Sequence, residues 1–112
     1  MNQLERFGET VAVYQKHGWQ LRRVLMRAET MHEAGAEFIE AVLSGIAPEQ
    51  ASVDALWFSR ESHAGREAWE LRLVAETPYA LFETFEADEE EEAREDLRRE
   101  MQARLTEYAA PR

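Results

Sequence analysis

The first segment of the chain carries the apolar stripe of an amphipathic helix. Its large apolar side chains recur at intervals of three and four, at Leu4, Phe7, Val11 and Tyr14. Gly18 is placed to end this helix in a left-handed conformation, which brings Tyr14 and Trp19 into contact across the cap. A strand through residues 10–14 is the alternative, but these residues alternate poorly between apolar and polar, so a helix is favoured.

The same pattern predicts four strands and two further helices. Strands are predicted at residues 19–27, 53–59, 68–75 and 79–86, and polar turns join the last three. Thr30 and Glu33 form a capping-box pair that introduces a helix, and Gly45 ends it. A long helix is predicted from about residue 88 to residue 108, because its apolar positions again follow the helical period.

These elements predict a single α+β domain over residues 1–112, in the order α-β-α-β-β-β-α. The first strand-helix-strand unit is expected to form a right-handed crossover, which would make its two strands parallel if they pair. The last three strands are expected to form an antiparallel meander. The prediction is therefore a four-stranded mixed sheet with helices mainly on one face.

One predicted face of the sheet is uniformly apolar and the other is mixed. The apolar face collects Trp19, Leu21, Leu25, Leu56, Phe58, Trp69, Leu71, Leu73, Leu81 and Phe85. The mixed face carries Arg22 and Arg72 together with two large apolar groups, Trp57 and Phe82. Because a solvated sheet face is normally polar, three explanations stay open. The N-terminal helix covers this face, another protein surface binds it, or it holds a small ligand whose acid group pairs with an arginine.

Charge and composition narrow the class of partner. The formal net charge is −10, which argues against binding nucleic acid or an anionic membrane, since both require a positive field. Much of this charge lies in residues 86–92, which are acidic except at Ala87 and are interpreted as the solvated start of the last helix. The chain has no cysteine, and it shows neither a signal-peptide pattern nor an apolar run of membrane-spanning length. A cytoplasmic location is therefore expected.

No residue set matches a catalytic, metal-binding or cofactor-binding motif, so no cofactor is expected and a non-enzymatic role is favoured. The leading hypothesis is an interaction or regulatory module that forms a homodimer or binds a protein partner through the mixed sheet face. The candidate binding residues are Arg22, Trp57, Arg72 and Phe82. The alternative is a small-ligand-binding or enzymatic domain that uses the same arginines and aromatic side chains in a sheet-face pocket.

Overall fold

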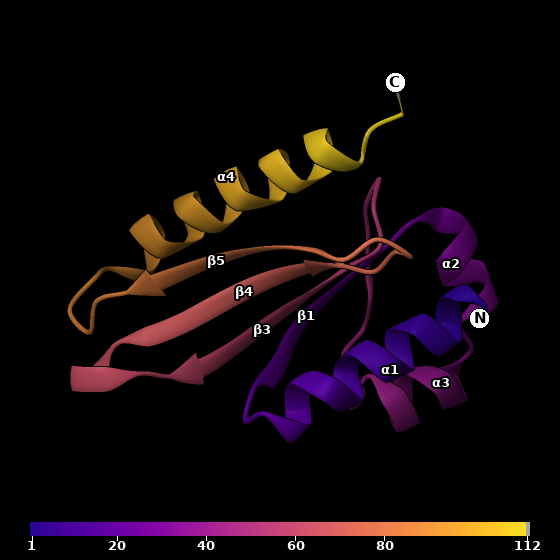
Figure 1. Ribbon diagram of the computed structural model, residues 1–112, viewed down its shortest axis with the longest axis horizontal. Coiled ribbons are helices and arrows are strands. Elements are labelled where there is room, and N and C mark those ends of the chain that lie inside the picture. Colours follow the sequence, from indigo (N-terminus) through magenta and orange to yellow (C-terminus); the bar gives the residue numbers. More distant parts are fainter. Residues whose placement is uncertain (112) are drawn as a thin grey trace.

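The computed structural model describes residues 1–111, in which four α-helices flank a five-stranded mixed sheet (Figure 1). The helices are α1 (Gln3–Lys16), α2 (Ala28–Glu33), α3 (Ala36–Val42) and α4 (Glu91–Ala109). The strands are β1 (Gln20–Met26), β2 (Glu49–Gln50), β3 (Ala55–Glu61), β4 (Glu67–Leu73) and β5 (Tyr79–Phe85), and a single 3-10 turn, η1 (His63–Gly65), joins β3 to β4. The predicted α+β class and the mixed sheet are confirmed, with one strand more than the four predicted.

The additional strand explains why the predicted pairing of the first two long strands is wrong. The sheet order is β2-β1-β3-β4-β5, and β1 pairs with β3 in the antiparallel direction rather than the parallel one. The strand parallel to β1 is the two-residue β2, which α2 and α3 deliver beside the end of β1. The chain then reverses once more before β3. A helical crossover does connect two parallel strands, as expected, but the second of these is the short strand β2 and not the predicted long strand β3.

The predicted end of α1 is confirmed in detail. Gly18 has a φ of +85°, which side chains disfavour, and this left-handed turn lets the Trp19 N–H donate to the Tyr14 carbonyl at 3.0 Å. The Tyr14 and Trp19 rings then meet edge to face, with their centroids 6.0 Å apart. The cap therefore directs the chain from α1 into β1.

The segment predicted as one helix is divided into two short helices, α2 and α3, at Ala34 and Gly35. Thr30 does not cap a helix, because it lies inside α2 and its hydroxyl donates to the Asp54 carboxylate at 2.7 Å. Asp54 is buried just before β3 and also accepts from the Arg27 backbone N–H at 2.7 Å and from the Gln3 side chain at 2.9 Å. This one carboxylate therefore joins α1, α2 and the start of β3.

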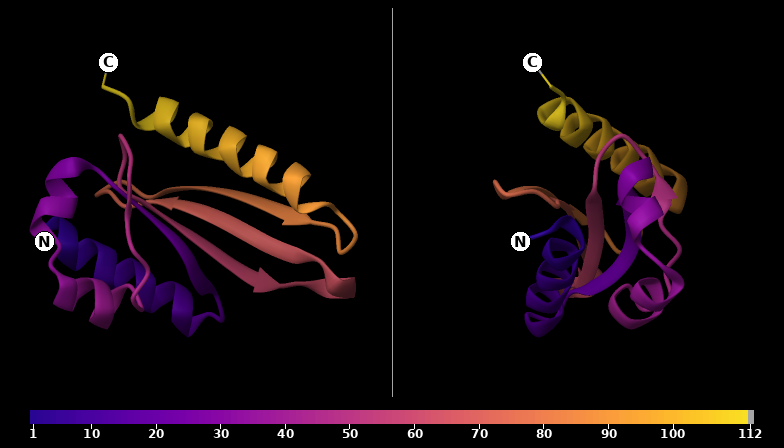
Figure 2. Two further views of the ribbon diagram at one scale, coloured as in Figure 1. Left: turned by 180° about the vertical axis from the view of Figure 1, so that it is seen from behind. Right: turned by 90° about the vertical axis from the view of Figure 1, so that its right-hand side faces the viewer.

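Helices cover both faces of the sheet, so the prediction that they lie mainly on one face is only partly right. Helix α1 packs on one side of the strands and α4 on the other (Figure 2). Helices α2 and α3 pack with the core of α1 through Met31, Phe38, Ile39 and Val42. On the side of α1 the core contains Phe7, Val11, Tyr14, Leu21, Val24, Met26, Leu43, Leu56, Phe58 and Val74. On the side of α4 it contains Leu25, Val53, Ala55, Trp57, Trp69, Leu71, Leu73, Phe85, Met101 and Leu105.

This division corrects the predicted composition of the two faces, for two reasons. Strand β3 pairs with β4 so that Trp57 is opposite Leu71 and Phe58 is opposite Glu70, whereas the predicted apolar face placed Phe58 with Leu71. In β1 the register shifts between Leu21 and Arg23, where an additional residue forms a β-bulge. A one-residue change of register transfers every side chain of a strand to the opposite face.

Candidate functional site

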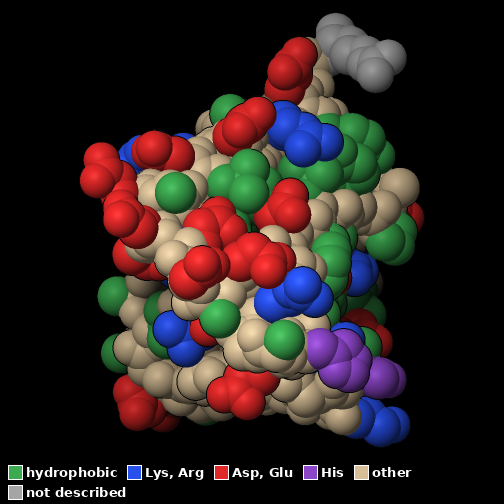
Figure 3. Space-filling model, turned by 90° about the vertical axis from the view of Figure 1, so that its left-hand side faces the viewer, with side chains coloured by type: hydrophobic (Ala, Val, Ile, Leu, Met, Phe, Trp, Pro, Cys, Tyr) green, Lys and Arg blue, Asp and Glu red, His purple; other side chains and the backbone are tan. Residues whose placement is uncertain are grey.

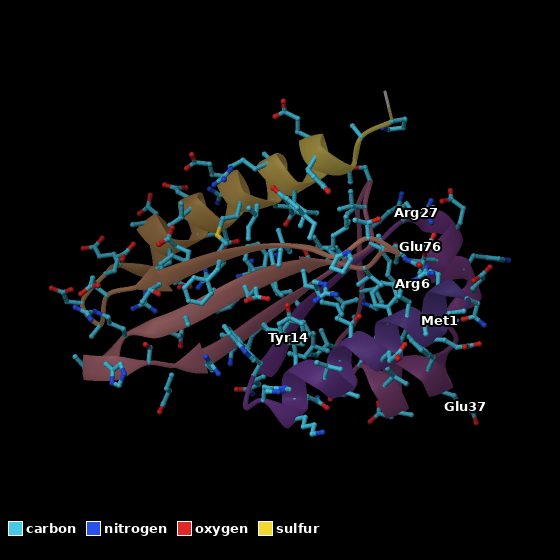
Figure 4. All side chains as sticks on the ribbon, viewed as in Figure 1. Met1, Arg6, Tyr14, Arg27, Glu37 and Glu76 are labelled. Carbon is cyan, nitrogen blue, oxygen red and sulfur yellow. The ribbon has the colours of Figure 1, made fainter. Side chains whose placement is uncertain are left out.

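The side of the sheet that faces α1 is covered over β1 and β3 but left open over β4 and β5. Two adjoining depressions of about 370 Å³ and 320 Å³ lie along this boundary. They share Val13, Tyr14 and Arg72 and together form one groove between α1 and the outer strands. The remaining lining residues are Met1, Arg6, Glu9, Thr10, His17, Trp19, Glu70, Ala75, Glu76 and Pro78. Met1, Arg6 and Glu76 lie toward one end of the groove, and Tyr14 lies farther along α1 (Figure 4).

Tyr14 forms the inner wall of the groove. Its ring stacks on Phe58, with a centroid separation of 4.0 Å and an interplanar angle of 7°. Its hydroxyl donates a hydrogen bond to the Glu70 carboxylate. Burial, together with this hydrogen bond, raises the pKa of Tyr14 to about 12, because both favour the neutral phenol. At neutral pH the side chain is therefore a fixed hydrogen-bond donor rather than a base.

Arg72 provides the positive charge in the groove. Its guanidinium lies 5.9 Å from the centre of the Tyr14 ring, within the range of a cation–π contact. The Arg72 Nε atom is buried and has no hydrogen-bond partner among residues 1–111. A buried donor without a partner is energetically costly, so the hydrogen bonding of Arg72 is incomplete within the described residues.

Phe82 is the main apolar group on the open part of the face. Its ring meets the Trp19 ring edge to face, with the ring centroids 6.3 Å apart, yet 57% of the Phe82 surface is exposed. Ala80 is likewise exposed on β5, and Val13 of α1 is an exposed apolar residue across the groove. The open face is therefore apolar on the β5 side, with the charge of Arg72 and Glu70 beside α1.

The structure does not bring the four predicted binding residues together. Arg72 and Phe82 lie on the open face, as described above, whereas Trp57 is fully buried in the core beneath α4. Arg22 lies at the β-bulge with its guanidinium 5.6 Å from the centre of the Trp69 ring, which belongs to the side of α4. Trp57 is therefore a core residue rather than a surface residue, because the register of β3 directs it toward α4.

Sequence reasoning missed Tyr14 and Glu70 as parts of the site. Tyr14 fits the apolar stripe of α1 and was therefore assigned to packing alone. The available signal was chemical, since a buried tyrosine normally requires a hydrogen-bond partner for its hydroxyl. Only the register of β4 shows that Glu70 provides this partner.

Comparison of this chain with protein-family models, with curated proteins and with solved structures gives no match in any of the three. None of the helices within residues 1–111 is long and apolar enough to cross a membrane. In the same part of the chain, no three His, Asp or Glu side chains converge as the ligands of a metal ion would.

Proposed function

We propose that the protein is a non-enzymatic interaction module that self-associates through β5 and the open sheet face beside it. The observation that carries the proposal is Phe82, a large apolar side chain that is mostly exposed on the part of the sheet face that α1 leaves open. Monomeric proteins rarely leave such groups beside further exposed apolar surface unless the surface has a partner. The partner favoured here is a second copy of the chain.

The edge of the sheet at β5 supports this choice. Among residues 1–111, strand β5 pairs only with β4, and its seven residues include neither lysine nor proline, which commonly protect such edges. The Thr84 N–H donates a hydrogen bond to the Glu83 carboxylate, which indicates that this N–H points away from β4. Because backbone direction alternates along an antiparallel strand, the N–H and C=O groups of Phe82 and Ala80 also point outward.

Two copies of this edge are complementary to one another. If two β5 strands pair antiparallel about a two-fold axis at Phe82, the outward backbone groups of each copy meet those of the other. The two Phe82 side chains then lie next to each other on the open face, where they remove apolar surface from water. An edge and one aromatic pair make a small interface compared with the roughly 1,200–2,000 Å² of stable complexes, so a concentration-dependent dimer is expected.

Light scattering on a sizing column, at several protein concentrations and at low and moderate salt, tests this proposal. A dimer is expected that persists in salt and that Phe82→Glu converts to a monomer, because the substitution places two carboxylates across the two-fold axis. Val13→Glu is the matched control, since Val13 is also an exposed apolar residue but belongs to α1. A wild-type monomer at all concentrations contradicts the proposal. If Val13→Glu dissociates the dimer and Phe82→Glu does not, the interface lies on α1 and not on β5.

A second function, binding of a small organic acid in the groove, is supported by the unpartnered Nε of Arg72. The groove combines this donor with the aromatic surfaces of Tyr14 and Trp19, as sites for small acids often do. Thermal-shift measurements with aromatic and aliphatic carboxylates test this function. Stabilisation by a carboxylate that is lost in Arg72→Gln supports it, and equal responses of both proteins exclude binding at Arg72.

A further inference from the structure

A separate depression on the side of α4 is lined almost entirely by charged groups. It measures about 350 Å³, and its lining consists of Arg22, Arg23, Glu67, Trp69, Glu91, Arg94 and Arg98. The β-bulge is essential to this arrangement, because the register shift between Leu21 and Arg23 gives β1 an additional residue opposite β3. As a result Arg22 and Arg23 both approach Trp69, at 5.6 and 5.9 Å from the ring centre.

The buried member of this group is Arg98. Only 3% of its side chain is exposed, and its guanidinium lies 4.0 Å from the centre of the Trp69 ring. The Arg98 Nε atom is buried without a hydrogen-bond partner within the described residues. A guanidinium fixed in this way is positioned in advance to bind an acceptor, because its side-chain entropy is already lost.

Three carboxylates partly balance the four arginines. Glu67 pairs with Arg94 at 3.4 Å, and Glu95 binds Arg23 through two hydrogen bonds of 2.9 and 3.0 Å. Glu95 also reaches Arg98 at 2.9 Å. Glu67 belongs to β4 and pairs with an arginine of α4, whereas Glu95 belongs to α4 and pairs with an arginine of β1. Both carboxylates therefore link α4 to the sheet.

The third carboxylate, Glu91, is held differently. It contacts both terminal nitrogens of Arg98, but at 3.2 and 3.3 Å, and 69% of its side chain is exposed. The hydrogen bond from Arg98 lowers the pKa of Glu91, so this carboxylate is charged at neutral pH. Glu91 thus occupies the two-pronged position that an external oxyanion would take on Arg98, at distances longer than a strong charge-assisted pair.

We infer that this depression, the arginine pocket, binds a doubly charged oxyanion of the phosphate class, which displaces the Glu91 carboxylate. Charge balance supports a dianion. Without Glu91, four arginines face Glu67 and Glu95, which leaves two positive charges to neutralise. Arg22 forms no ion pair with any residue from 1 to 111, and it is free to turn toward the ligand.

The acidic surroundings do not remove this preference. Acidic side chains predominate on the end of the molecule where α4 begins, and basic ones lie singly among them (Figure 3). At physiological ionic strength, however, exposed charges are screened beyond about 8 Å. The guanidinium groups that contact the ligand therefore determine binding, while the distant carboxylates slow the approach of an anion.

Titration with inorganic phosphate at constant ionic strength, followed by NMR of the indole N–H groups, tests the inference. The Trp69 N–H donates to Glu67 at 2.6 Å inside the pocket, so its resonance is expected to move saturably with phosphate. Chloride at the same ionic strength is expected to have no such effect. A phosphate monoester measured in parallel distinguishes a site for free phosphate from a site for a phosphorylated ligand.

Two substitutions give opposite expectations. Arg22→Gln is expected to weaken phosphate binding about tenfold through the loss of one charge-assisted contact, while Glu91→Gln strengthens it by removing the competing carboxylate. Arg99→Gln is the control, because Arg99 lies on the exposed side of α4 and outside the pocket. No saturable shift of Trp69, or equal weakening by Arg99→Gln, overturns the inference. The pocket lies on the opposite side of the sheet from the groove, so this result is independent of the proposed dimer.

Discussion

Asp54 provides a quantitative test of how the elements are joined. Its carboxylate accepts hydrogen bonds from the Arg27 N–H, the Thr30 hydroxyl and the Gln3 side chain, at 2.7, 2.7 and 2.9 Å. Asp54→Ala removes all three acceptor contacts at once. The Gln3 amide still donates to the Val74 carbonyl at 2.8 Å, so the main loss falls on the other two donors.

The expected loss of stability is large because leaving a buried donor unpaired costs more than removing the donor together with its bond. A buried donor left without an acceptor costs about 1–3 kcal/mol. The Thr30 hydroxyl is buried and the Arg27 N–H is part-buried, so the expected loss in the free energy of unfolding is roughly 2–4 kcal/mol. That is a large part of the roughly 5–15 kcal/mol available to a domain. Thr30→Val removes a donor together with its bond and leaves the carboxylate satisfied, so it is expected to cost only about 1 kcal/mol.

Urea unfolding, followed by circular dichroism and fluorescence, measures both free energies by linear extrapolation. Asp96→Ala serves as the control, because that carboxylate is largely exposed and its pairing with Arg99 is at the surface. The control is expected to match the wild-type protein within error. If Asp54→Ala costs no more than Thr30→Val, then Asp54 does not join these elements in the way described, and the reasoning from unpaired donors is refuted.

Three further predictions concern single residues. Trp57→Ala is expected to destabilise the fold by roughly 3–5 kcal/mol, whereas Phe82→Ala, at an exposed position, is expected to cost under about 1 kcal/mol; chemical unfolding of both variants checks this difference. In an ultraviolet titration, Tyr14 is expected to ionise near pH 12, and Tyr14→Phe removes that step. Because its folded pKa is raised, the stability contributed by the neutral Tyr14 phenol is complete below about pH 10 and is lost as the pH rises through 12. Gly18→Ala is expected to cost roughly 1–2 kcal/mol in thermal unfolding, since alanine disfavours the left-handed backbone at that position.

Local signals in the sequence predicted the elements well. The stripe and glycine of α1 determine both the helix and its exit, because helical period and left-handed glycine act over a few neighbouring residues. The three long strands of the meander were likewise placed within two residues of their observed bounds. Such features depend on the chain nearby and little on the rest of the molecule.

Pairing between strands was much less predictable. The two residues of β2 carry no strand pattern of their own and pair with β1 only because α2 and α3 bring them there. The β-bulge in β1 depends on one residue at Arg22, and nothing in the local alternation marks it. These two details decide the direction of β1 against β3 and the face of each side chain.

The errors in strand register also misplaced part of the predicted binding site. Arg72 and Phe82 were placed on the open face correctly relative to each other, because they belong to the adjacent strands β4 and β5. Trp57 and Arg22 were placed there wrongly, because the register of β3 and the bulge of β1 transfer them to the side of α4. The pairing of Tyr14 with Glu70 joins residues 56 positions apart, which a pattern in one sequence does not reveal.

The covering of one sheet face by α4 alone has a consequence for synthesis of the protein. Helix α4 follows every strand in the chain, and its Met101 and Leu105 complete the core around Trp57 and Trp69. While the nascent chain still lacks α4, the meander emerges with that aromatic face bare, although α1 is already present to close the other side. Unburied apolar sheet surface invites aggregation. The acidic residues at the start of α4 follow directly after β5, so the nascent chain carries a strong negative charge while that face is still exposed.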